Sequence, residues 1–102
     1  MIGYILFHEG VDNHIAFDIL VREDYYEKNK DYFEELKKGL YTTDCEYVDK
    51  FMSKYAGYIY LGSEDLAHYI DLNVAHIILI HELLEKGFGI VVMDGEELTF
   101  LK

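Results

Sequence analysis

The spacing of apolar residues changes along this chain, and that change limits the fold more than any other feature. Residues 2–7 and 14–21 are β-rich apolar runs, and apolar residues alternate with others from Ile15 to Val21, the period of a strand. From Asp24 to Gly39 they recur every three or four positions, the period of a helix. Residues 1–42 are therefore predicted to form a β-hairpin followed by one helix.

Residues 43–102 predict three further helices and a second hairpin. Thr43 and Glu46 have the spacing of a capping box, which predicts a helix that stops at Gly57. Near the C-terminal end of the chain, Asp94-Gly95 separates two β-rich runs and is the strongest short hairpin signal. Between these signals we expect, in order, a strand at 58–61, a helix at 64–70 capped by Ser63, a turn at 71–73 and a helix at 74–87. With 102 residues, 51% of them hydrophobic, residues 1–102 are predicted to be one α+β domain.

Two segments, "SEDLAHYIDLN" (63–73) and "LLEKGFGIVVMDGEELTFL" (83–101), resemble the second helix, turn and wing of the winged helix-turn-helix family. The resemblance covers residues 43–102 and implies a winged-helix-like αβααββ unit after the N-terminal hairpin and helix. In that family the third helix enters the major groove, and its exposed residues contact base edges. By position, the resemblance assigns recognition to Ala75, His76, Ile78, Leu79 and Glu82, and the wing tip to Asp94, Glu96 and Glu97.

None of these recognition and wing residues is Lys or Arg, which departs from the family's pattern. The chain holds 20 acidic and 9 basic residues, a formal charge of −11, and residues 43–102 hold 11 acids against 4 lysines. Such a charge repels phosphate over a Debye length of roughly 8 Å. DNA binding is therefore disfavoured. It stays the alternative function, in which a dimer gathers a basic stripe from the N-terminal helix: Arg22, Lys28, Lys30, Lys37 and Lys38.

The helix expected at 74–87 is apolar on nearly all sides. Ile77, Ile80, Leu83 and Leu84 are expected in the core, which leaves Ile78 and Leu79 as surplus. Either the first part of the chain covers them, or they form a homodimer or partner surface.

The 10 tyrosines beside the many acids favour a protein partner, including one whose natural ligand is nucleic acid. A protein that binds such a partner through its acidic surface would mimic the negative charge of nucleic acid. We therefore expect a small non-enzymatic regulatory protein that acts through protein–protein contacts, by self-association as a homodimer, by an acidic face, or by both.

No catalytic or cofactor motif occurs, since the chain lacks a Gly-rich phosphate loop, a nucleophile elbow and an HExxH pair. No enzyme activity, cofactor or metal site is expected; a cation held by His8 and His14 with Glu9 and Asp12 is a minor alternative. The lone Cys45 excludes an intramolecular disulfide, and no apolar run is of bilayer length. These features predict a cytoplasmic protein without membrane contact. The lack of Gln beside many Glu points to a thermophilic source.

Overall fold

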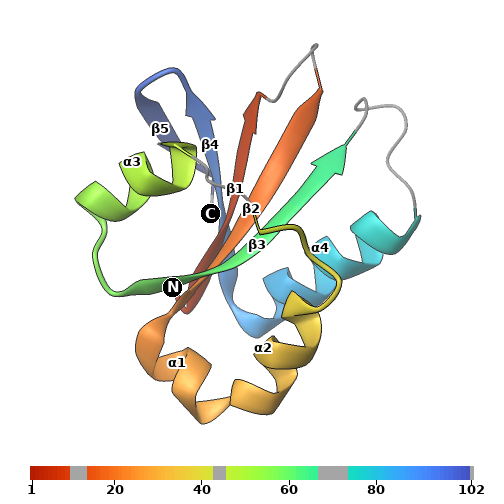
Figure 1. Cartoon of the computed structure of the whole chain (residues 1–102). Helices are drawn as coiled ribbons and strands as arrows, with labels where there is room; N and C mark the ends of the chain where they lie inside the picture. Colours follow the sequence, from red (N-terminus) through yellow and green to blue (C-terminus); the bar gives the residue numbers. More distant parts are fainter. Residues whose placement is uncertain (10–13, 43–45, 67–73, 102) are drawn as a thin grey trace.

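A computed structural model of the chain describes residues 1–9, 14–42, 46–66 and 74–101. It shows a five-stranded mixed sheet with helices on both faces (Figure 1). The elements in chain order are β1 (Gly3–Glu9), β2 (Ile15–Arg22), α1 (Glu23–Lys28), α2 (Lys30–Lys37), α3 (Glu46–Lys54), β3 (Tyr58–Leu66), α4 (Val74–Lys86), β4 (Phe88–Asp94) and β5 (Glu97–Phe100). The predicted α+β class is therefore confirmed.

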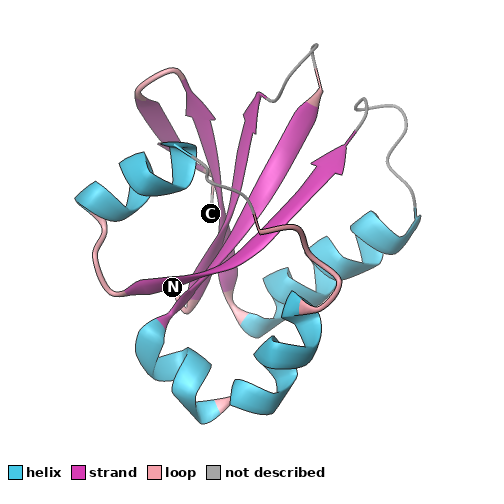
Figure 2. Cartoon of the chain, viewed as in Figure 1, coloured by secondary structure: helices cyan, strands magenta, loops and turns pink. Residues whose placement is uncertain are grey.

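The strands lie side by side in the order β3-β2-β1-β4-β5 (Figure 2). β2 pairs antiparallel with both β1 and β3, and β5 pairs antiparallel with β4. β1 and β4 are parallel neighbours, with Gly3 opposite Phe88 and His8 opposite Met93. The carboxyl ends of β1 and β4 consequently meet at one edge of the sheet.

Each face of the sheet has its own apolar core. On one face, Tyr26 of α1, Phe33 of α2 and Leu83 of α4 pack against buried residues of the strands, and these are Ile5, Phe17, Ile19, Val21, Leu61, Leu66 and Phe88. On the other face, Val48 and Phe51 of α3 pack against Leu6, Leu20, Val91 and Met93. Both faces are thus covered by helices, so the strands carry apolar residues on both sides.

The N-terminal hairpin is confirmed, while the single helix expected at 24–39 is two helices. α1 and α2 meet at Asn29, whose ψ of 38° departs from helical geometry. The backbone N–H of Asn29 donates hydrogen bonds to the carbonyl oxygens of Tyr25 and Tyr26. Tyr26 of α1 and Phe33 of α2 both pack in the same core. Packing on the sheet therefore overrides a periodicity that would also suit one straight helix.

The helix expected at 64–70 is wrong for its first residues, because residues 58–66 form β3. Ser63 is no helix cap but a strand residue opposite Asp18, and Leu66 lies opposite Ile15. Pairing with β2 supplies ladder hydrogen bonds and buries Leu66, which outweighs the low strand propensity of "GSED". The rest of that expected helix and the turn at 71–73 lie outside the described residues.

The later elements agree better with the sequence. α3 and α4 are confirmed as helices, α4 ends before Gly87 (φ +105°), and β4 and β5 form the expected hairpin, with Gly95 at φ +62°. The Thr43 cap lies outside the described residues, as does Cys45.

The hairpin is part of the central sheet, because β4 also pairs with β1, and the specific winged-helix arrangement is not confirmed. Among the helices that the structure describes, none is long and apolar enough to cross a bilayer.

Gly62 is the residue at which β3 admits a bulge against β2. The register shifts between Ile19 and Leu20, and Gly62 has φ +150°. A Cβ at Gly62 would lie 2.6 Å from Cβ of Leu40 and 2.8 Å from the carbonyl oxygen of Tyr41. Gly57 also has positive φ (+97°), but a Cβ there would meet nothing within 4 Å.

Gly62→Ala should therefore destabilise the protein by roughly 2–4 kcal/mol, the sum of backbone strain and overlap with the Leu40 Cβ and the Tyr41 carbonyl oxygen. Gly57→Ala should cost only about 1 kcal/mol, because it carries the backbone strain alone. Urea unfolding of both variants measures the difference. Equal losses would show that the close contact at Gly62 relaxes without cost.

Candidate functional site

The most unusual feature of the interior is a group of polar side chains around Asp18, which is fully buried on the α3 side of the sheet. Nε2 of His8 lies 2.6 Å from one Asp18 carboxylate oxygen. The other oxygen accepts hydrogen bonds from the hydroxyls of Ser63 and, at 3.4 Å, Tyr60. We call His8, Asp18, Tyr60 and Ser63 the Asp18 cluster.

Strand register brings the members of the Asp18 cluster together. His8, Asp18 and Ser63 come from β1, β2 and β3, and Asp18 is directly opposite Ser63. The ring of Tyr47 in α3 stacks on the His8 ring with centroids 4.3 Å apart and planes at 16°. The cluster therefore joins three strands and one helix by polar and aromatic contacts.

The surroundings of His8 favour its charged form. Nδ1 lies 3.2 Å from the backbone carbonyl oxygen of Glu9, and Nε2 faces the Asp18 carboxylate. Since both partners are acceptors, only the doubly protonated ring can donate to both. Burial lowers the pKa of His8, but the hydrogen bond and charge of Asp18, then the Glu9 carbonyl and Asp65, raise it by more, so that it lies above the ordinary 6.5.

The geometry of the Asp18 cluster is that of a buried ion pair, not of a nucleophile with its base. A serine–histidine relay needs the serine hydroxyl on a histidine nitrogen. Here Ser63 donates to Asp18, and the Nε2 of His8 faces the second oxygen of the same carboxylate. The Asp18 cluster therefore lacks the serine–histidine contact of a nucleophilic relay. The expected lack of enzyme activity remains a prediction.

Asp18→Asn should cost about 3–5 kcal/mol, because it leaves the charged His8 ring buried without its counter-ion. Ser63→Ala keeps the ion pair and should cost about 1 kcal/mol, the value of one hydrogen bond. Asp49→Asn, at an exposed carboxylate of α3, is the matched control and should cost less than about 0.5 kcal/mol. Chemical denaturation tests the order, and a loss for Asp18→Asn no larger than for Asp49→Asn would contradict the ion-pair assignment.

The stability that His8 supplies should depend on pH. Because the folded-state pKa of His8 is raised above 6.5, its contribution is fully present below pH 6.5 and is lost as the pH rises through the folded-state pKa. The difference in free energy of unfolding between the natural protein and His8→Gln should therefore shrink with rising pH. Urea unfolding from pH 5 to 10 measures it. Parallel curves for the two proteins would show that His8 does not titrate in this way.

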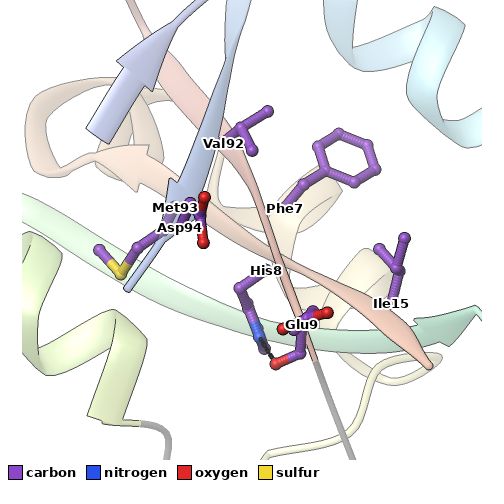
Figure 3. Close-up of a pocket in the computed structure, with 7 residues that line it drawn as sticks. All are labelled: Phe7, His8, Glu9, Ile15, Val92, Met93 and Asp94. Carbon is purple, nitrogen blue, oxygen red and sulfur yellow. Dashed lines mark hydrogen bonds between the residues drawn. The ribbon is translucent and has the colours of Figure 1, made fainter. Parts of the chain in front are cut away.

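A hollow of about 290 Å³ lies at the carboxyl ends of β1 and β4, next to His8. Figure 3 shows the side chains of Phe7, Ile15 and Val92 on one side of the strand pair and those of His8 and Met93 on the other. Glu9 and Asp94, the last residues of β1 and β4, also line the hollow among the described residues. In open α/β sheets, ligands commonly bind outside the carboxyl ends of parallel strands, and β1 and β4 are such a pair.

The residues that the resemblance assigned to recognition do not all lie on the exposed side of α4. Ala75, Ile78 and Glu82 are exposed, while His76 is half-buried, with Nε2 3.2 Å from a Glu64 carboxylate oxygen. Leu79 packs against a core that includes Phe17 of β2 and Phe33 of α2, so the first of the two alternatives, coverage by the first part of the chain, holds for Leu79.

Ile77, expected in the core, is 43% exposed instead. The buried side of α4 is centred on Leu83 and includes His76, which packs edge-on against the Phe17 ring at 6.0 Å. Because Leu79 and Leu83 pack against the core from the same side of α4, Ile77 faces outward.

The expected wing residues lie together at the β4–β5 turn, where Asp94 is opposite Glu97, while the expected basic-stripe residues extend from the end of β2 along α1 and α2. Asp94 lines the hollow, Glu97 is exposed, and Glu96 lies 3.9 Å from Lys50. Arg22 pairs with Asp24 at 2.5 Å and Lys38 with Glu35 at 2.9 Å.

Lys28, Lys30 and Lys37 lie along α1 and α2 among six acids: Glu23, Asp24, Glu27, Asp31, Glu34 and Glu35. The structure does not join the basic residues into a stripe free of acids.

Among the described residues, no group of three or more His, Cys, Asp or Glu side chains could hold a metal ion. Asp12, the remaining member of the minor cation-site alternative, lies outside the described residues.

Sequence reasoning missed Asp18, Tyr60 and Ser63. A signal was available for Asp18. Leu6 and Leu20 lie on the same face of the hairpin as Asp18, so this face carries apolar residues, as the opposite face does. A hairpin that is apolar on both faces is covered on both faces, and an acid within it must be buried and paired.

Comparison with the models of known protein families, with curated protein sequences and with solved structures finds no match to this chain.

Proposed function

We propose that this protein is a non-enzymatic binding protein that acts through protein–protein contacts, the first of them with a second copy of itself. Three large aliphatic residues on one side of α4 carry the proposal: Val74 is 70% exposed, Ile77 43% and Ile78 60%. We call them the α4 apolar face. Clustered exposed aliphatic residues on a helix are typical of association surfaces.

Helical spacing explains why these side chains lie together. Residues 74, 77, 78 and 81 recur at three and four positions, so they share the side of α4 opposite Leu83. Glu82 and Glu85 are exposed further along the same helix. The surface is therefore apolar toward the helix N-terminus and acidic toward its C-terminus.

This asymmetry makes the α4 apolar face complementary to itself. Two copies of α4 packed antiparallel about a two-fold axis near Ile78 would place Ile77 and Ile78 against the same residues of the other copy. Glu82 of each copy would then approach the N-terminal end of the other helix, whose dipole favours a negative charge. An isologous contact of this kind closes as a dimer.

The expected affinity is modest. Complete burial of an aliphatic side chain contributes roughly 1.5–3 kcal/mol, and these residues are already partly covered. Association costs roughly 4–15 kcal/mol in lost freedom, and a charge of −11 on each copy adds repulsion. A dimer that forms at micromolar or higher concentration and strengthens with added salt is consistent with these opposing terms.

DNA binding is less well supported than self-association. The basic residues of α1 and α2 are accompanied by six acids, and Arg22 and Lys38 already lie beside carboxylates. Neutralising a phosphate backbone needs several cations together on one surface. No specific contact in the described part of the chain favours this function.

Ile78→Glu should abolish self-association, because it places an acid at the centre of the apolar contact. Leu101→Glu is the matched control, since Leu101 is 61% exposed and lies outside α4. Sedimentation equilibrium over a wide concentration range should show a rising mass for the natural protein and Leu101→Glu, and a monomer for Ile78→Glu. A natural protein that stays monomeric at millimolar concentration, or an Ile78→Glu variant that associates equally well, would sink the proposal.

A further inference from the structure

We infer that the hollow at the carboxyl ends of β1 and β4 binds a lysine or arginine side chain of a basic partner protein. This site is separate from the α4 apolar face, and it does not rest on self-association. Three observations carry it: the apolar wall of the hollow, the sign of its charges and its size.

The apolar wall suits the hydrocarbon stem of a basic side chain. Phe7 and Val92 are neighbours in the parallel β1–β4 register, and Ile15 is opposite Glu9 in the β1–β2 hairpin. All three apolar residues are only partly buried, so they keep a surface on which CH₂ groups can pack. The Phe7 ring also provides an aromatic surface, to which a cation is attracted.

The charges of the hollow select a cation. Glu9 and Asp94 are exposed carboxylates on two adjacent strand ends and line the same hollow. Among the described lining residues, His8 is the one potential cation, and its two ring nitrogens face the Asp18 carboxylate and the Glu9 carbonyl. His8 therefore offers no free charge to an anion, and the described lining is negative.

The size of the hollow favours a side chain over a cofactor. Pockets for drug-sized ligands span roughly 300–1,000 Å³, and this hollow of about 290 Å³ lies at the bottom of that range. Exposed carboxylates bind a free amine only weakly, because water screens them. A side chain attached to a protein gains further contacts around the hollow, and the net charge of −11 attracts a basic protein over a distance.

The test is an NMR titration of the ¹⁵N-labelled full chain with the peptide acetyl-Gly-Lys-Gly-amide at low salt. The same peptide with glutamine in place of lysine is the neutral control. The lysine peptide should shift the amide signals of residues 7–9, 15 and 92–94, whereas the glutamine peptide should not. n-Butylamine should bind several-fold more weakly than the lysine peptide, because it lacks a peptide backbone. Equal binding of n-butylamine would overturn the assignment to a protein side chain.

Variants separate this hollow from general attraction to an acidic surface. Glu9→Gln with Asp94→Asn should weaken peptide binding by about fivefold or more. Glu23→Gln with Glu27→Gln removes the same charge from exposed positions on α1, away from the hollow, and should change peptide binding less than about twofold. Equal losses in the two double variants would show nonspecific attraction. Signals of the hollow that shift with protein concentration alone would identify a second copy as the occupant and overturn the partner assignment.

Discussion

The buried contact between Asp18 and His8 links more of this structure than any other interaction. Asp18 receives hydrogen bonds from β1 on one side and from β3 on the other, and His8 in turn supports the Tyr47 ring of α3. A buried carboxylate without partners would cost several kcal/mol. A shift of one residue in the β1–β2 register would turn Asp18 toward the opposite core, which is apolar. The ion pair therefore favours one register for three strands and one position for α3.

The positions of the two proposed binding surfaces follow from the parallel pairing of β4 with β1 and from the side of α4 that is buried. Because β4 lies parallel to β1, the ends of both strands meet at one edge, which places Glu9 beside Asp94 around the hollow. α4 buries the side that carries Leu83 and leaves Val74, Ile77 and Ile78 exposed on the other. Both proposed surfaces therefore lie outside the two cores, one on the exposed side of α4 and one at the carboxyl ends of β1 and β4.

The elements predicted correctly are those with local signals. The hairpin at Asp94-Gly95 and the stop of α4 before Gly87 depend on residues within a few positions of each other, and both are confirmed. The errors share a different cause. The strand over 63–66 exists through its pairing with β2, some 45 residues earlier in the chain, and the exposure of Ile77 follows from the packing of Leu79 and Leu83 against the core of the sheet. Neither contact can be inferred from the period of apolar residues alone.

The sequence by itself determined the α+β class, the N-terminal hairpin, the turn at Gly95 and the strong negative charge, because composition and short-range backbone preferences are enough for these. Only the tertiary structure decided that Asp18 is buried with His8, that β1 and β4 are parallel, and that Leu79 rather than Ile77 packs inward. These outcomes depend on contacts between residues far apart in the chain. Their free energy comes from burial and pairing, which no single segment of the sequence contains.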